Sequence, residues 1–474
     1  MLPNVKASPN TGILPDVPSP RSADFTAFDN EFAACLTALG LESQPSFITA
    51  LSGGSDSAAL ALLAQRYALK HRKQHKAVII DHGLRNGSSA EAARVCRRFE
   101  ALGLTCHVLR VVASRPKAAL QEWARNHRLA LLSDAARAEG AVVLFGHHSG
   151  DLAETVMMRL LRGSGLAGLA GIPARRQQGG VIFARPILNW PAAKSRAICA
   201  AFNCAYEQDP SNNDLGFERV RVRQMLAGGD CADDRCQRFS KNLLRLAGAS
   251  GAITRAFDTA VAPTLQAAMT WQIAGFVDFD PAPLAGLPQA CWWRVMRRVI
   301  QAVGGRPYGA SDAAGIECRQ RVMDGRAATV GGCHFHPHPA SVSSSAESRK
   351  GRYTLFRETG RQTVRHPIQP HKPVIFAGCW QVLSPVEGVV HALADAPQRR
   401  GHPDAGTAQM DMPESWRIFP HRARQAIPVV TGLDGMRFYP HLHKTKPDHS
   451  DGKVQAFHMG MAETQIYFAD RQVR

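Results

Sequence analysis

The sequence predicts an α/β protein, built on a parallel doubly wound sheet and followed by a helical domain and a small β-rich C-terminal domain. Three observations support this prediction. Short β-branched runs alternate with helical runs over roughly residues 45–165. A glycine turn joins the first of these strands to the first helix. Beyond residue 350, short apolar runs are separated by turn residues. Alternating strands and helices indicate a parallel sheet covered on both faces.

The expected elements follow from this alternation. Strands are predicted at residues 47–51, 77–81, 106–112 and 142–146, and helices at 25–41, 57–69, 88–102, 118–139 and 152–162. Ligands of such sheets bind beyond the carboxyl ends of the strands. The residues that follow each strand are therefore the first candidates for a functional site.

The hexapeptide after the first strand is the strongest such candidate. It reads Ser52-Gly53-Gly54-Ser55-Asp56-Ser57 and opens a helical run. Paired glycines and a helix N-terminus present backbone N–H groups to an anion, which predicts a nucleotide phosphate site. Asp56 is the best candidate to hold Mg²⁺. An ordinary tight turn with a Ser/Asp helix cap is the alternative. The hexapeptide lacks the lysine of a P-loop.

Further candidates follow the second and fourth strands. Asp81 ends the second strand, and His147 and His148 follow the fourth. Asp151 and Glu154 then lie three residues apart on one face of the next helix. Metal binding by the two histidines, or a helix cap by Asp151 beside a buried His148, are two alternatives. We favour an acid–base or substrate-holding role, because both loops meet at one edge of the sheet.

Basic residues predict a polyanionic partner. The formal net charge is +18, and the sequence pI is near 9.8. Arg162 begins an Arg-Gly-Ser-Gly loop, and Arg219, Arg221 and Arg223 alternate in a later run. The loop could lie over the site, and the alternating arginine run suits phosphates, although a solvated charged face is the alternative for that run.

In order and spacing, these motifs resemble those of the tRNA(Ile)-lysidine synthetases, which are N-type ATP pyrophosphatases with a Rossmann-like fold. The resemblance rests on the Ser52–Ser57 loop, residues 81–85, the His-His-x-x-Asp-x-x-Glu-Thr run, residues 162–165 and residues 209–212. It is strong over residues 45–226 and weaker over residues 228–335, where Trp292-Trp293-Arg294 contributes. Gly150 departs from the pattern, because many members carry an acidic residue there.

The resemblance implies a ligase that joins free L-lysine to the wobble cytidine of tRNA(Ile) with a CAU anticodon. ATP would adenylate the cytidine, and lysine would displace AMP to form lysidine, which changes the codon read from AUG to AUA. The resemblance implies that the catalytic residues are Asp56, His148 and Asp151, and that ATP is bound by Ser52, Gly53, Gly54, Ser55, Asp56, Ser57 and Asp81. It also implies that lysine is bound by Asp151 and Glu154, and tRNA by Arg162, Arg219, Arg221 and Arg223. Whether His148 or Asp151 is the base stays open at this point.

The expected organisation has five parts. These are a flexible tail (1–24) that is not a signal peptide, a catalytic domain (25–226), a helical tRNA-binding domain (227–336), a linker (337–350) and a β-rich domain (351–474). Because no apolar run is long enough to span a membrane, we expect a cytoplasmic protein, and a homodimer is possible. The run Cys333–His338 is interpreted as a plain strand end, with metal binding as the alternative.

Two other functions compete with the ligase. A tRNA thiolase of the same ATP-pyrophosphatase class would need a cysteine pair, and the sequence contains no Cys-x-x-Cys. A non-catalytic nucleotide-dependent RNA-binding protein would need the phosphate loop but not His148, Asp151 and Glu154.

Overall fold

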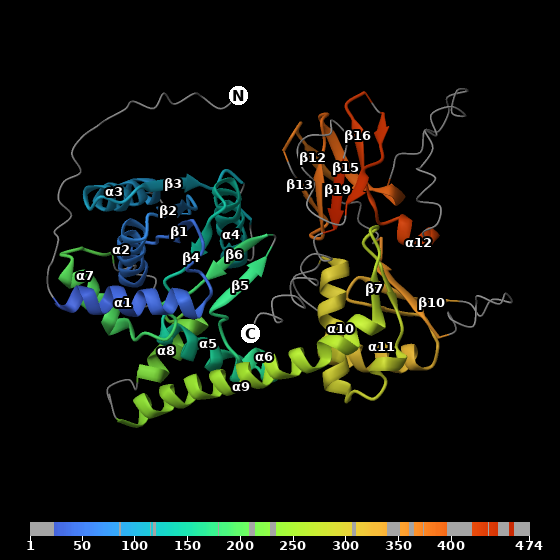
Figure 1. The fold of residues 1–474 in the computed structure, drawn as a ribbon, viewed down its shortest axis with the longest axis horizontal. Coiled ribbons are helices and arrows are strands. Elements are labelled where there is room, and N and C mark those ends of the chain that lie inside the picture. Colours follow the sequence, from blue (N-terminus) through green and yellow to red (C-terminus); the bar gives the residue numbers. More distant parts are fainter. Residues whose placement is uncertain are drawn as a thin grey trace. The chain divides into compact units, whose positions relative to one another are not determined.

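The chain forms two compact units in a computed structural model, residues 1–256 and 257–474 (Figure 1). The structure describes residues 23–84, 87–113, 115–116, 120–178, 180–207, 214–227, 234–305, 310–338, 351–359, 365–372, 374–395, 420–434, 436–443 and 455–458. The expected tail and most of the expected linker lie outside these ranges, as does the motif at residues 209–212.

The first unit is built on a six-stranded sheet. Its strands, in spatial order, are β3 (Cys106–Arg110), β2 (Gln74–Asp81), β1 (Ser46–Ala50), β4 (Val142–Leu144), β6 (Val181–Ala184) and β5 (Arg175–Gln178). Neighbouring strands are parallel except for β5, which runs antiparallel to β6. The four predicted strands are confirmed. The β5–β6 pair was not predicted, because β5 consists only of Arg and Gln residues and the apolar run of β6 is only four residues long.

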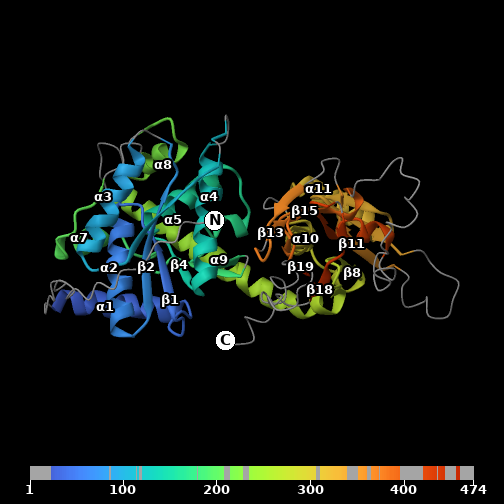
Figure 2. The same cartoon turned by 90° about the horizontal axis from the view of Figure 1, so that it is seen from above.

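Helices cover both faces of this sheet (Figures 1 and 2). They are α1 (Ala23–Ala38), α2 (Ser55–Lys70), α3 (Ser88–Ala101), α4 (Leu120–Glu139), α5 (Ser149–Leu161), α6 (Leu166–Leu169), α7 (Ala192–Ala201), α8 (Glu218–Ala227) and α9 (Asp234–Ala268). Phe47 of β1 packs in the core beneath α1, α2, α3 and α7, whereas its neighbour Ile48 packs in the core beneath α4. This alternation is what a strand buried on both faces requires, and it confirms the doubly wound prediction.

The second unit begins with helices packed on an antiparallel sheet. The helices are η2 (Ala282–Leu284), α10 (Gln289–Gly304) and α11 (Asp312–Met323). The sheet has the order β7 (Met269–Trp271), β8 (Val277–Phe279), β11 (Tyr353–Arg357), β10 (Cys333–Pro337) and β9 (Ala328–Val330). Trp292 and Tyr353 are fully buried in the shared core. Strand β11 pairs with β10 across the proposed 337–350 linker, so this sheet draws on residues from both sides of that segment.

The end of the chain forms two four-stranded sheets. One contains β12 (Arg365–Ile368), β15 (Gly388–Ala392), β16 (Pro428–Gly432) and β17 (Arg437–Phe438). The other contains β13 (Val374–Phe376), β14 (Trp380–Leu383), β19 (Gln455–His458) and β18 (His441–His443). The short helices η4 (Leu393–Asp395) and α12 (His421–Arg424) lie between strands along the chain. The predicted β-rich region is thus confirmed.

Two features of the second unit bear on earlier expectations. His334 and His338 of the candidate metal run contact Thr329 and Thr354 through their ring nitrogens. Among the residues that the structure describes, no three His, Cys, Asp or Glu side chains gather in a way that would hold a metal ion. The described helices also include none that is long and apolar enough to cross a membrane.

A buried histidine links the two central strands to α2. His75 of β2 contacts the hydroxyl of Thr49 through Nε2 at 2.9 Å and Gln65 Oε1 through Nδ1 at 2.9 Å. Burial lowers the pKa of His75 to about 3. Between pH 6.5 and about pH 3, His75 therefore binds a proton in the unfolded chain but stays neutral in the folded protein. His75 therefore does not affect stability above pH 6.5, and it destabilises the folded state increasingly as the pH falls from 6.5 toward 3.

We expect His75→Gln to flatten the dependence of stability on pH. Between pH 6.5 and pH 5 the parent protein should lose roughly 2 kcal/mol of unfolding free energy through His75, and the variant should not. Urea denaturation of both proteins at the two pH values measures the difference. Equal pH slopes in parent and variant would contradict the prediction.

Candidate active site

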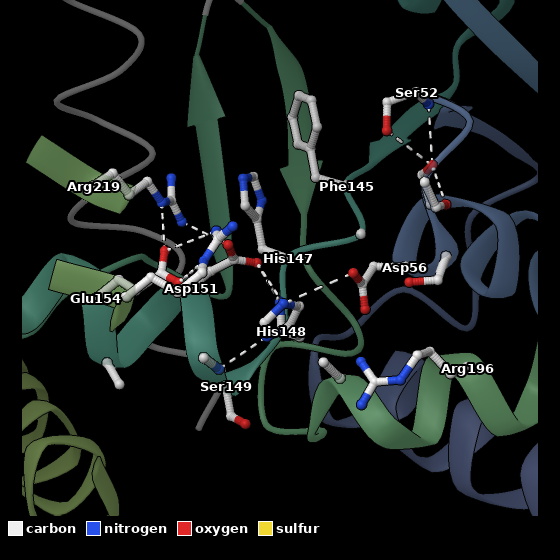
Figure 3. Close-up of a pocket in the computed structure, with 18 of the residues that line it drawn as sticks. Ser52, Asp56, Phe145, His147, His148, Ser149, Asp151, Glu154, Arg196 and Arg219 are labelled. Atoms are coloured by element: carbon white, nitrogen blue, oxygen red, sulfur yellow. Dashed lines mark hydrogen bonds and ion pairs between the residues drawn. The ribbon is translucent and has the colours of Figure 1, made fainter. Parts of the chain in front are cut away.

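The site lies where the strand order of the first unit reverses. The chain passes from β1 to β2 on one side and from β4 to β6 on the other, so β1 and β4 flank the switch point. A cavity of about 880 Å³ opens there (Figure 3). It is lined by the loop after β1, the end of β4, the start of α5 and residues of α4, α7, α8 and α9. This is the place at which open α/β sheets bind ligands.

The Ser57 side chain fixes the conformation of the loop after β1 through two hydrogen bonds to the backbone. Ser57 Oγ donates to the carbonyl of Gly54 at 3.0 Å and accepts the backbone N–H of Ser52 at 3.1 Å. Gly53 has a φ of +87°, which favours glycine. Helix α2 begins after Gly54 with no side-chain cap. Its first backbone N–H groups are therefore available to an anion at the cavity wall.

The residue Gly146, just after β4, packs directly against the backbone at the start of α2. A Cβ atom on Gly146 would lie 2.8 Å from the carbonyl carbon and oxygen of Asp56 and 2.8 Å from the nitrogen of Ser57. Only glycine permits this approach, which places the start of α5 beside the phosphate loop. Sequence reasoning used Gly146 only as a strand end.

His148 connects the two loops. Its Nδ1 accepts the backbone N–H of Gly150 at 2.9 Å, so the neutral ring carries its proton on Nε2. That Nε2 faces two carboxylates, Asp56 Oδ2 at 3.8 Å and Asp151 Oδ2 at 3.6 Å (Figure 3). Gly150 makes room for this ring, because a Cβ there would lie 2.6 Å from His148 Cε1.

Asp151 and Glu154 form an ion network with α8. Arg219 donates from Nε to Glu154 Oε2 and from Nη2 to Asp151 Oδ1, both at 2.6 Å. Arg223 Nε donates to Glu154 Oε1 at 2.6 Å. The backbone N–H of His148 donates to Asp151 Oδ2 at 2.9 Å. All four carboxylate oxygens are thus hydrogen-bonded, and Glu154 is only 3% exposed.

A guanidinium–aromatic wall closes another side of the cavity. Arg128 and Arg185 lie over the ring of Phe145, with their guanidinium carbons 5.3 and 5.4 Å from its centre. Arg185 Nε donates to His147 Nδ1 at 3.2 Å. Burial lowers the pKa of His147 to about 4, with a further lowering by Arg185 and Arg128 against the opposing effect of Asp151. His147 is therefore neutral at pH 7.

Comparison with known proteins identifies the family. A family model described as a PP-loop domain matches residues 26–228. A tRNA(Ile)-lysidine synthase of Methylobacterium nodulans is 36% identical over 316 residues, which cover 63% of this chain and 90% of that protein. The chain belongs to the tRNA(Ile)-lysidine synthase family. A second member, from Bradyrhizobium diazoefficiens, is 35% identical over 284 residues, or 56% of this chain and 74% of that synthase.

Not every residue expected at the synthase site lines the cavity. Asp81 instead organises the loop after β2, where its carboxylate accepts the backbone N–H of Gly83 and the hydroxyls of Ser88 and Ser89. These hydrogen bonds and the neighbouring Arg110 lower the pKa of Asp81, although burial, the largest influence, opposes them.

The four expected tRNA-binding arginines fall into two groups. Arg219 and Arg223 face the cavity and hold its carboxylates. Arg162 pairs with Glu218, and Arg221 donates to the carbonyl of Leu215. Sequence reasoning missed the pairing of α8 with α5. The sequence did contain a signal for it. Arg219 and Arg223 are four residues apart and Asp151 and Glu154 are three apart, so each pair lies on one face of its helix and the two pairs can meet.

We expect Gly146→Ala to damage the synthase site and the fold together. The added methyl group must displace the start of α2, at a cost of about 1–3 kcal/mol in unfolding free energy. Pyrophosphate release should slow by roughly ten- to a hundredfold, because the phosphate loop moves. Gly165→Ala is the matched control, since its Cβ would meet nothing within 4 Å. Parent-like turnover of Gly146→Ala would refute the close approach.

Proposed function

We propose that this chain ligates free L-lysine to the wobble cytidine of tRNA(Ile) with a CAU anticodon, converting ATP to AMP and pyrophosphate. One observation carries the proposal. The phosphate loop and the carboxylates of Asp151 and Glu154 line the same cavity. His148 lies between them, with its Nε2 3.8 Å from Asp56 Oδ2. An enzyme that couples ATP cleavage to the binding of an amine needs these two sites side by side.

The first step activates the base. The ring carbonyl oxygen of cytidine attacks the α-phosphorus of ATP, an oxygen–phosphorus bond forms, and pyrophosphate leaves. The charge of pyrophosphate is concentrated, and the uncapped N–H groups at the start of α2 are arranged to stabilise it. Ser52 and Ser57 lie on the same wall of the cavity and fix the loop through their hydroxyl contact at 3.1 Å.

Asp56 fits the expected magnesium ion. Its Oδ1 is buried and has no hydrogen-bond partner, whereas a buried carboxylate oxygen normally has one. Mg²⁺ favours one or two carboxylate oxygens together with substrate phosphates and water. When bound, the ion would neutralise charge on the phosphates. Asp56 is the residue that would hold it.

The second step needs an uncharged amine. The ε-amine of free lysine has a pKa of about 10.4, so it arrives protonated. Asp151 and Glu154 suit this cation, but Arg219 bridges both of them in the structure. Lysine binding thus requires Arg219 to move aside. Arg223 stays paired to Glu154 through Nε and Oε1 at 2.6 Å.

We assign the acceptance of the lysine proton to Asp151. His148 is unsuited to this role, because its Nδ1 lone pair already accepts the N–H of Gly150 and its Nε2 carries a proton. After losing its proton, the amine attacks the ring carbon that bears the adenylate. A carbon–nitrogen bond forms, the carbon–oxygen bond breaks, and AMP leaves.

A thiolase is the second candidate, and the cavity disfavours it. None of the described residues that line the cavity is a cysteine. The nearby Cys199 donates to the carbonyl of Ser55 at 3.4 Å, and burial raises its pKa to about 12. Such a thiol does not supply the thiolate that sulfur transfer needs.

Labelled lysine tests the function directly. With ATP and total tRNA, we expect label only in the minor isoleucine tRNA whose anticodon is CAU. Asp56→Asn should abolish pyrophosphate release and labelling while tRNA binding persists. Label in other tRNAs, or unchanged turnover of Asp56→Asn, would refute the ligase proposal.

Glu154→Gln tests the lysine site. The variant keeps the volume of the side chain but removes its charge, so the KM for lysine should rise about tenfold or more, and that for ATP much less. Steady-state kinetics with each substrate varied in turn measures both constants. Glu122→Gln, an exposed change on α4, is the control. Equal increases in both constants would remove Glu154 from lysine binding.

A further inference from the structure

Five arginines gather at the β5–β6 edge of the first sheet. They come from α4 (Arg125, Arg128), α5 (Arg159), β5 (Arg176) and the residue after β6 (Arg185). Within the part of the chain that the structure describes, none of the five pairs with a carboxylate. Other arginines of this unit do find such partners, as Arg66 does with Asp29 and Arg98 with Glu207.

A shared ring contact places two of these arginines side by side, and their mutual electrostatic effects connect the others to them. Arg128 and Arg185 share the ring of Phe145, within 5.3 and 5.4 Å of its centre. Burial lowers the pKa of Arg185 to about 10, and the charges of Arg125 and Arg176 lower it further. The charge of Arg125 also lowers the pKa of Arg128 and of Arg159, after the larger effect of burial.

Two members of the group are fixed in place. Arg159 donates from Nη1 to the carbonyls of Gly168 and Gly171 at 2.7 Å each. Arg185 donates from Nη1 to the carbonyl of Pro173 at 2.8 Å. A guanidinium has five N–H donors, so each arginine keeps donors for a further ligand. Arg125 and Arg176 are exposed.

Gathered like charges repel each other, which destabilises the free protein unless a ligand compensates. The ligand that suits them is an extended polyanion, because only Arg128 of the five lines the cavity while Arg125 and Arg176 lie outside it. ATP placed on the phosphate loop would lie in the cavity, which the outer arginines do not line. A sugar–phosphate backbone presents charges at regular intervals along a path that can enter a cavity.

We propose that the arginine surface, defined as Arg125, Arg128, Arg159, Arg176 and Arg185, binds the RNA backbone next to the base being modified. Arg128 contacts the strand where it enters the cavity, and Arg125 and Arg176 contact flanking phosphates outside. This assignment rests on the proposed function. It gives the RNA a different set of arginines from Arg219 and Arg223, which hold the carboxylates.

The test removes the two outer charges. An Arg125→Gln/Arg176→Gln double variant is titrated with a fluorescent anticodon stem-loop RNA at several salt concentrations. Each lost phosphate contact lowers the slope of log affinity against log salt by about 0.7–0.9, so we expect a decrease of roughly 1.5. Lys70→Gln/Arg72→Gln is the matched control. It removes two exposed charges at the end of α2 and just before β2, on the amino side of the parallel strands, and should leave the slope unchanged.

Two results would overturn the inference. One is an equal salt slope in the double variant and in the control. The other is unchanged RNA binding with a loss of poly-glutamate binding, which would assign the surface to an acidic protein. Because RNA binding is measured without lysine or turnover, it is independent of the labelling experiment. Weaker RNA binding by the double variant would support the surface even if the wild-type protein labelled no tRNA.

Discussion

The backbone contact between Gly146 and the start of α2 positions the whole site. It lets the end of β4 lie against the peptide that joins Asp56 and Ser57. From this contact the chain continues directly into α5, so His148 and Asp151 come within reach of the phosphate loop. If the two strand ends were separated by one side chain, the phosphate loop and the carboxylates of α5 would lie further apart.

The two halves of the cavity handle charge in opposite ways. On the phosphate side, backbone N–H groups and a helix N-terminus attract an anion without any lysine. On the carboxylate side, Asp151 and Glu154 are already neutralised by Arg219 and Arg223. These carboxylates become available to a cation only when Arg219 leaves them, as the proposed lysine binding requires.

Local sequence patterns were sufficient for the sheet and for much of the site. The strand–helix alternation, the Ser52–Ser57 loop and the i, i+3 spacing of Asp151 and Glu154 are encoded over a few residues each. Strand β5 was missed because it consists only of Arg and Gln residues, and β6 was missed because its apolar run is only four residues long. The partners of Asp151 and Glu154 were missed for another reason. They lie more than sixty residues away on α8, and only tertiary packing selects which arginines meet them.

The network of Asp151, Glu154, Arg219 and Arg223 also limits how this sequence can change. Glu154 is buried and accepts hydrogen bonds from both Arg219 and Arg223, so removing either guanidinium leaves this carboxylate with a weaker set of partners. A single substitution at one of these positions is therefore disfavoured unless a second position changes with it. We therefore expect the four residues to change together, although Glu154 and Arg219 are 65 positions apart in the sequence.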